Sequence, residues 1–466
     1  MDVSLRALNR FGLGARRGEA KGIGDARGWL RSQLKAVPRL EPPNVATPEA
    51  LAQAVHTFRS AAQGDTLQRR AARRQLVEIA SAESRAALIE RLTSEQPFAE
   101  RLVAFWSNHL CISAGAKALV APFAGSYERE VIRPHVLGRF EDMVLASAKH
   151  PAMLVYLDNF QSIGPNSMAA QRGRRQRGAR GLNENYAREL LELHTLGVEG
   201  GYTQEDVQEL ARVLTGWTVS GLVRGGAGNN GRGRYGRRLF PQQEADGDIG
   251  FVFQPLLHEP GARMVLGKKY ADDGVAQGER VLRDLCRHPS TAKFVATKLV
   301  RHFVADEPPA AAVERIAGAF RDTDGDLAAV ARALIELPES WNAAMRKFRS
   351  PQDWYVAALR AFEVKTLGDP AVSVLRQLRQ PLWAPQAPKG FGDSMQEWAD
   401  PDSLMNRAEL ARTIARRLGA DSNPRVLLEV TDLAAGDPLR TLVSDGSIAA
   451  ADRLALGIAG PAFQWR

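Results

Sequence analysis

The chain has 466 residues, of which 44% are apolar and 25% are charged. These proportions are ordinary for a globular protein and exclude global disorder, while the length by itself suggests two or three subdomains. The two cysteines exclude a disulfide framework and a cysteine-rich zinc site. No apolar run reaches the roughly 20 residues that span a bilayer, and the N-terminal segment lacks the apolar stretch of a secretory signal. A cytoplasmic protein is therefore predicted.

The formal net charge of +9 is concentrated in two Arg/Gly segments, residues 171–181 and 224–238. Together they hold ten arginines and no acidic residue, so the rest of the chain is near neutral. Arg175, Arg177 and Arg234 are the candidates for anion binding among them. Segments of this kind hold nucleic acid or another polyanion through phosphate contacts, or they are solvated insertions without a binding role. The sequence leaves both interpretations open.

The periodicity of apolar residues predicts helices along most of the chain. From about residue 66 to 150 they recur every three or four positions, and strand signals are nearly absent. Pro151 and Pro289 each follow a histidine and open a new periodic run, as proline does at the first position of a helix. The predicted fold class is mainly α, a large orthogonal bundle of many helices with a small β-hairpin flap and long irregular loops.

Residues 220–270 are the predicted exception to the helical pattern, a flexible Gly/Arg loop followed by the β flap. The short runs FVFQP and RMVLGKKY supply its strands. We expect residues 1–466 to form one helical domain. Its predicted subdivision is a helical half over residues 1–219, the loop and flap, and a second helical half over residues 271–466.

The centre of the chain, LNENYARELLELHTLGVEGGYTQEDVQELARVLTGW, predicts a helical hairpin. Its first helix should run from about Asn183 to Leu196. Thr203 and Asp206 fit a capping box that begins the second helix, and two glycines supply the turn between them. Two antiparallel helices are therefore expected.

One face of the first helix is polar although the opposite face is apolar. At 100° per residue, Asn185, Arg188, Glu189 and Glu192 share this polar face. They form either ordinary four-residue ion pairs on a solvated surface or a catalytic group. In the second case Arg188 neutralises one carboxylate and leaves the other with a raised pKa for acid or base catalysis. These four residues are the candidate catalytic residues.

An antiparallel hairpin brings the beginning of its first helix and the end of its second helix to the same place. Asn183, Glu184 and Trp217 should therefore lie together, beside both Arg/Gly segments. With the three arginines named above, they are the candidate substrate-binding residues.

Histidines on the predicted helices are the remaining candidates for chemistry. His194 lies about 180° from the carboxylates of its own helix, which argues against a metal site shared with them. His109 and His302 also lie on apolar faces, where hydrogen-bonded core histidines are usual. A metal site is a hypothesis only if the fold brings together His109, His194, His258 and His302.

Besides the central hairpin, several segments are distinctive: FGLGARRGE, RLVAFWSNHL, AKHPAMLVYLDN, HEPGARMVLGKKY, HPSTAKFVATKLVRHFVAD, KFRSPQDWYVAALRA and GPAFQWR. With these stretches the chain resembles the domain of unknown function 1800 family over nearly its whole length. The resemblance implies a bacterial protein, an envelope or secreted location for many members, and a sulfatase-like companion protein. Leu110, Glu259 and Arg263 depart from the residues usual in the family, as does the missing export signal.

Two main classes of function follow from these observations. The first is an enzyme, a hydrolase or transferase, that acts on an anionic polymer or a small anionic substrate through the Glu/Arg/Asn helix face. The second is a non-catalytic protein that binds nucleic acid or another polyanion with its Arg/Gly loops. By resemblance alone, a structural partner of a sulfatase-like protein is a third. The sequence identifies no cofactor and leaves these alternatives open.

Overall fold

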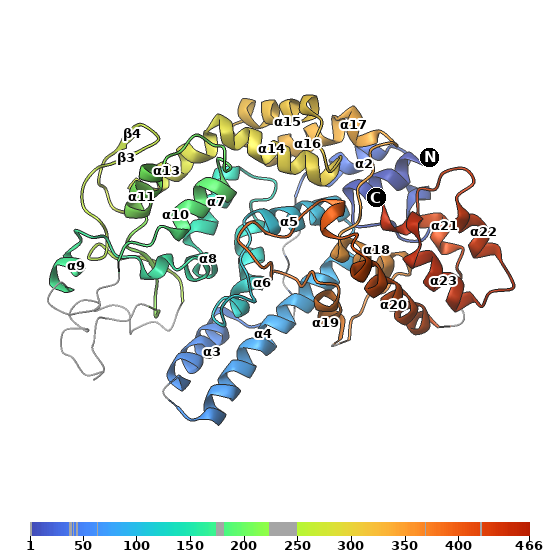
Figure 1. Ribbon diagram of the computed structural model, residues 1–466, viewed down its shortest axis with the longest axis horizontal. Helices are drawn as coiled ribbons and strands as arrows, with labels where there is room; N and C mark the ends of the chain where they lie inside the picture. Colours follow the sequence, from blue (N-terminus) through green and yellow to red (C-terminus); the bar gives the residue numbers. More distant parts are fainter. Residues whose placement is uncertain are drawn as a thin grey trace.

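Prolines and short polar side chains mark the beginnings of the helices, and the chain folds as the mainly α-helical protein that its periodicity predicts. The computed structural model describes residues 2–36, 40, 42, 45–62, 64–173, 181–222, 249–368, 370–419 and 422–466. Figure 1 shows the helices arranged as an arch from which one pair of helices projects. Their buried apolar side chains form a continuous core that extends from Leu5 to Phe463.

The N-terminal segment enters the core and then leaves it as the projecting pair of helices (Figure 1). Its elements are α1 (Val3–Arg6), the π-helix η1 (Ala7–Phe11), the 3-10 helix η2 (Glu19–Gly22), α2 (Ala26–Ser32), α3 (Pro48–Ala61) and α4 (Thr66–Thr93). A capping box begins α4, because Asp65 and Gln68 each accept a hydrogen bond from the other's backbone amide. The far end of α4 returns to the core, where it packs against α6 and α18.

The next elements are α5 (Pro97–His109), η3 (Ala121–Phe123), α6 (Ala124–Tyr127), the π-helix η4 (Glu128–Ile132), α7 (Phe140–Lys149), α8 (Pro151–Tyr156), η5 (Asn159–Gln161) and α9 (Met168–Gly173). Pro151 opens α8 as predicted. The histidine before it caps the helix, because Nδ1 of His150 accepts a hydrogen bond from the amide of Ala152 at 3.1 Å. Pro289 and His288 begin α14 in the same way.

The central hairpin departs from its prediction in two respects. Its elements are α10 (Asn185–Glu189), the π-helix η6 (Leu190–His194) and α11 (Gln204–Val213). The first helix is therefore shorter than expected and ends in a π turn, although the capping box of Thr203 and Asp206 is present. Gln204, at the beginning of α11, donates a hydrogen bond to Glu184 at the beginning of α10 (2.7 Å). The two helices therefore contact each other at their first turns.

The sheets also pair differently from the predicted flap. The strands are β1 (Trp217–Val219), β2 (Phe251–Phe253), β3 (Arg263–Val265) and β4 (Lys268–Tyr270). The run RMVLGKKY forms the β3–β4 hairpin by itself, whereas β2 pairs antiparallel with β1. The run FVFQP thus pairs with the strand that directly follows the central hairpin.

The second half of the chain supplies the upper edge of the arch and the C-terminal group of helices in Figure 1. Its elements are α13 (Val275–Arg287), α14 (Pro289–Phe303), α15 (Ala310–Asp322), α16 (Leu327–Glu336), α17 (Pro338–Trp341), α18 (Pro351–Ala361), α19 (Pro370–Gln377), η7 (Met395–Glu397), α20 (Pro401–Leu418), α21 (Val426–Val430), α22 (Pro438–Ser444), α23 (Ala450–Ala459) and η8 (Pro461–Gln464). The two chain ends lie close together: Arg466 donates a hydrogen bond to the carbonyl oxygen of Arg10 (3.0 Å).

Within the described parts of the chain, no helix combines the length and the apolar character needed to cross a bilayer. α4 is long enough, at 28 residues, but it carries many charged side chains.

Candidate functional site

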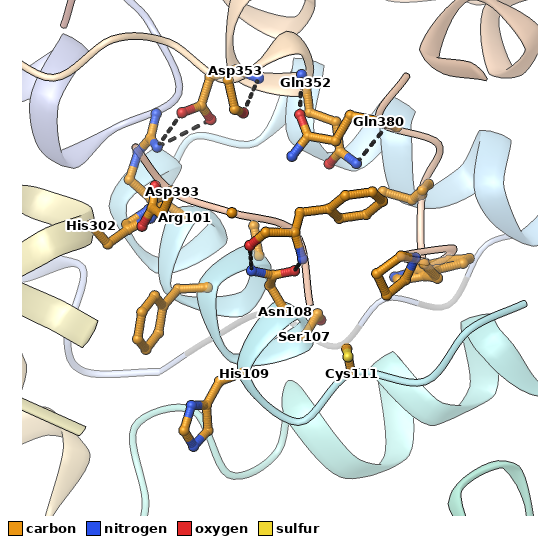
Figure 2. Close-up of a pocket in the computed structure, with 18 of the residues that line it drawn as sticks. Arg101, Ser107, Asn108, His109, Cys111, His302, Gln352, Asp353, Gln380 and Asp393 are labelled. Atoms are coloured by element: carbon orange, nitrogen blue, oxygen red, sulfur yellow. Dashed lines mark hydrogen bonds and ion pairs between the residues drawn. The ribbon is translucent and has the colours of Figure 1, made fainter. Parts of the chain in front are cut away.

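A cavity of about 230 Å³ lies where α5, α14 and the beginning of α18 meet the segment of residues 380–393 (Figure 2). Sites for drug-sized ligands measure ~300–1,000 Å³, so this cavity suits a smaller ligand. A larger cavity of about 710 Å³ lies between α18, α19 and α20. Its charged lining residues, among those described, are Glu409 and Arg417. The chemistry of the lining, rather than its size, makes the smaller cavity the candidate site.

The segment of residues 380–393 is held in place by hydrogen bonds between its backbone and side chains of α5 and the residues that follow it. Sequence spacing does not predict these bonds. The side-chain amide of Asn108 donates to the carbonyl oxygen of Phe391 (3.0 Å) and accepts from its amide (2.8 Å). Gly390 makes this approach possible, since it has a φ of +81° and a Cβ there would lie 2.5 Å from the Asn108 carbonyl oxygen. Farther along, Ser113 donates to the carbonyl oxygen of Pro385 (2.7 Å).

This segment places Asp393 against His302, near the end of α14 (Figure 2). Nδ1 of His302 lies 2.7 Å from Oδ2 of Asp393, and Nε2 is buried without a hydrogen-bond partner among the described residues. Burial lowers the pKa of His302, so the ring is neutral at pH 7. Although burial raises it, the neighbouring His302 and Lys347 lower the pKa of Asp393 to about 2. A neutral imidazole that donates from Nδ1 to a carboxylate carries its lone pair on Nε2.

Three cationic side chains of the cavity lack a carboxylate partner. Lys298 lies one turn before His302 on α14 and makes no hydrogen bond or ion pair within the described chain, although its ammonium lies 5.6 Å from the Phe294 ring centre. Burial lowers the pKa of Lys298 to about 8. Arg301 donates a single hydrogen bond, to the carbonyl oxygen of Asp306 (3.3 Å), and Lys389 is exposed at the rim.

Two further arginines of the lining are neutralised. Asp353 accepts both of its hydrogen bonds from Arg101 at 3.0 and 3.1 Å (Figure 2), and Nε of Arg466 lies 3.3 Å from the same carboxylate. Arg91 lies 3.3 Å from the buried carboxylate of Glu128. The lining itself holds five cationic side chains and two carboxylates. Of the five cations, Arg91 and Arg101 have carboxylate partners and Lys298, Arg301 and Lys389 have none among the described residues.

The hydroxyl and thiol groups of the cavity are engaged in hydrogen bonds. Ser107 donates to Glu128 at 2.9 Å. Cys111 lies 3.0 Å from the carbonyl oxygen of Pro388, and burial raises the pKa of its thiol to about 12. A thiol of this kind stays protonated at neutral pH and is a poor nucleophile.

The predicted catalytic face lies outside this cavity, on the partly exposed surface of α10 and η6. Arg188 forms four-residue ion pairs with Glu184 (3.7 Å) and Glu192 (3.4 Å), and Asn185 is exposed. Glu189 is half-buried and has no hydrogen-bond or ion-pair partner among the described residues. Burial and then the neighbouring Glu192 raise the pKa of Glu189.

Of the predicted substrate-binding residues, the structure describes Asn183, Glu184 and Trp217, and none of these three is exposed. Asn183 is half-buried, and its amide donates to the carbonyl oxygen of Leu157 (3.2 Å). Trp217 is fully buried. Arg175, Arg177 and Arg234 lie outside the described residues. Gly181, at the end of the first Arg/Gly segment, and Thr218, which precedes the second, both form hydrogen bonds with residues 160–163. The two segments therefore join the described structure at the same place.

The four histidines do not meet at one point. His109 is buried and its Nε2 lies 3.1 Å from the carbonyl oxygen of His194, and Figure 2 shows it apart from the His302–Asp393 pair. His258 instead pairs through Nδ1 with the carbonyl oxygen of Thr215 (2.9 Å). Across the described ranges, no group of three or more His, Cys, Asp or Glu side chains is arranged to hold a metal ion.

A comparison with family models identifies the relatives of this chain. The model of the family described as "Protein of unknown function (DUF1800)" matches residues 6–464. The chain belongs to this family. No curated protein and no solved structure matches it. The family description carries no activity, so the geometry of the cavity has to supply the functional argument.

For this DUF1800 member, sequence reasoning missed the His302–Asp393 pair. His302 shares a helix face with apolar residues, a pattern that predicts a core histidine. The signal that could have found it is the group Lys298, Arg301 and His302, whose spacings of three and four residues put three nitrogen-bearing side chains on one side of α14. Asp393 stands 91 residues away, in a segment without periodicity.

Proposed function

We propose that the cavity between α5 and α14 binds a small anionic substrate and transfers a proton through His302, as in a hydrolase or transferase. The single observation that carries this proposal is the His302–Asp393 pair, 2.7 Å apart, in a cavity with surplus positive charge. The reaction class and the anionic substrate are those predicted from the sequence. The proposed site, however, is the cavity and not the central hairpin.

The anionic substrate follows from the charges that have no partner. Lys298, Arg301 and Lys389 are not neutralised by carboxylates among the described residues, and desolvation makes a half-buried ammonium costly until an anion pairs with it. A phosphate, sulfate or carboxylate group in the cavity would form charge-assisted hydrogen bonds with these groups. The ligand supplies the missing negative charge.

The role of His302 follows from its ordered ring. Asp393 fixes the tautomer and stabilises the imidazolium that forms when Nε2 accepts a proton. The proton comes from the nucleophile, a water molecule or a substrate hydroxyl, and His302 can return it to the leaving group. Lys298, one turn away on α14, is placed to hold the charge of the substrate during this transfer.

Chemical modification tests both parts of the proposal without a known substrate. Diethyl pyrocarbonate acylates neutral imidazole, and mass spectrometry locates the modified histidine. We expect His302 to be modified and sulfate to protect it, whereas His135, half-exposed and not part of the cavity lining, should be modified without protection. An unreactive His302, or one that sulfate leaves unprotected, would contradict a base in an anion-binding cavity.

A second candidate for acid or base catalysis is Glu189, as inferred from the sequence. It is supported by the missing partner and the raised pKa of Glu189, while Arg188 pairs with Glu192. If Glu189 acts as an acid or base, Glu189→Gln should abolish turnover and Glu192→Gln should leave it nearly unchanged, with similar melting temperatures. Equal effects of the two variants would refute this assignment.

The polyanion-binding alternative depends on the two Arg/Gly segments, most of whose residues lie outside the described residues. It stays a prediction of the sequence, and steep salt dependence of binding would be its signature.

A further inference from the structure

A second, smaller cavity of about 80 Å³ lies where the two ends of the chain meet. Four arginines from three parts of the sequence line it, and two carboxylates oppose them: Arg6, Arg10, Arg346, Arg466, Asp432 and Asp437. It is separate from the candidate site between α5 and α14. Arg466 stands between the two, since its Nη1 donates to the carbonyl oxygen of Arg10 (3.0 Å) and its Nη2 to that of His302 (2.8 Å).

Two buried groups in this small cavity lack hydrogen-bond partners. Arg10 is 2% exposed; its Nη1 donates to the carbonyl oxygen of Val304 (3.3 Å), and its Nε has no partner within the described chain. The hydroxyl of Thr431, 4% exposed, also has none. Burial and then the nearby Arg466 and Arg6 lower the pKa of Arg10 to about 9. Buried polar groups are normally hydrogen-bonded, so an unpartnered guanidinium nitrogen and an unpartnered hydroxyl from residues that line the same cavity point to a missing ligand.

The two carboxylates of the cavity are already engaged. Asp432 pairs with Arg6 at 2.9 Å, and Asp437 caps α22 by accepting a hydrogen bond from the amide of Leu439 (3.0 Å). Among the described residues, no carboxylate lies within ion-pairing distance of Arg10 or Arg346, although the guanidinium of Arg346 stacks on Trp465 (5.2 Å). Positive charge is therefore in excess here as well.

We propose that this small cavity is a second anion site that holds one tetrahedral oxyanion, inorganic phosphate or sulfate, between Arg10, Thr431 and Arg346. Guanidinium and hydroxyl groups are the donors that such oxygens prefer. A volume of about 80 Å³ admits an ion of this size and is too small for a nucleotide or a sugar phosphate. The site would join the first and last segments of the chain.

Calorimetric titration with sulfate, and in parallel with phosphate, tests this proposal when the cavity between α5 and α14 is first disabled. In a Lys298→Met/Lys389→Met background we expect one remaining site. Adding Thr431→Val and Arg346→Met should weaken that site by about tenfold or more. Adding Arg412→Met instead, which removes an exposed arginine of α20 that has no ion-pair partner among the described residues, should leave the affinity unchanged. Arg346 is exposed and Thr431→Val is nearly isosteric, so these variants should fold even where a change at Arg10 does not.

Two outcomes overturn the proposal: no sulfate or phosphate binding in the Lys298→Met/Lys389→Met background, or binding that Thr431→Val and Arg346→Met leave unchanged. A different result would contradict the proposed function, namely that Lys298→Met/Lys389→Met binds sulfate as tightly as the wild type. The two proposals can therefore be judged separately.

Discussion

Charged side chains gather in two regions of the molecule, the polar face of α10 and η6 and the cavity between α5 and α14. On the helix face, Arg188 is neutralised by Glu184 and Glu192 from the same helix. In the cavity, Asp393 and Asp353 come from segments far from α14 and α5, and three cations are left without a carboxylate. Ion pairs within one helix are ordinary on a solvated surface, whereas unpaired, partly buried charge costs stability and indicates a ligand site.

The largest effect should come from the proposed base. His302→Gln removes the proton acceptor, and a loss of general-base catalysis typically lowers turnover by ~10²–10⁴-fold. Asp393→Asn should approach the same loss, because the ring is no longer held in the required tautomer. Hydrolysis of para-nitrophenyl phosphate and sulfate measures the effect, with His135→Gln as the control that should keep its activity. Equal activity of His302→Gln and wild type would remove His302 from the mechanism.

The next largest effect concerns the buried carboxylate beneath the cavity. Asp353→Asn leaves Arg101 and Arg466 buried without a counter-charge, and breaking such a pair costs ~3–5 kcal/mol of unfolding free energy. Urea denaturation should show this loss. The matched surface change, Asp324→Asn, removes the exposed partner of Arg139 and should cost no more than about 1 kcal/mol. If the two variants lost similar unfolding free energy, the buried ion pairs of Asp353 would contribute no more stability than an exposed pair.

Low pH should destabilise the protein through the same carboxylate, that of Asp353. Although burial raises it, Arg101 and Arg466 hold the pKa of Asp353 well below its usual range. A depressed carboxyl pKa stabilises the folded state above the unfolded pKa of ~3.9, and that stability is lost as the pH falls further. Unfolding free energy should therefore drop more steeply below pH 4 in the wild type than in Asp353→Asn. Parallel curves would contradict the assignment.

A smaller effect should appear in the pH dependence of anion binding. Burial lowers the pKa of Lys298 to about 8, and only the protonated amine holds an anion. Sulfate has no titration near this pH, so its affinity should fall as pH rises from 7 to 9, by about tenfold for one lost charge contact. Lys298→Met should bind weakly and without this pH dependence. A wild-type affinity that is flat over this range would argue against Lys298 as a ligand group.

The smallest effect should come from the helix face. Arg188→Ala removes two partly exposed four-residue ion pairs, each worth ~0.2–0.5 kcal/mol. Thermal unfolding should shift only slightly, and the difference from wild type should shrink in high salt because surface pairs are screened. A loss comparable to that of Asp353→Asn would show that this face is more than a solvated surface.

The same comparison explains what sequence reasoning could recover. Pro151, Pro289 and the Thr203–Asp206 box begin helices through local bonds, so the helical class and many boundaries were predictable. The π turn of η6 was not, because it depends on tertiary packing rather than on local propensity. The cavity was not either, since the contact between Asn108 and Phe391 joins residues 283 positions apart.

The central claim is that the unpaired cations of α14 bind an anion, and a sulfate titration at pH 7 tests it most directly. Lys298→Met should raise the dissociation constant for sulfate at the cavity between α5 and α14 by about tenfold or more. Lys293→Met removes an exposed lysine from the same helix, outside the cavity, and should leave the constant unchanged. Identical affinities for wild type, Lys298→Met and Lys293→Met, or no sulfate binding at all, would contradict the account.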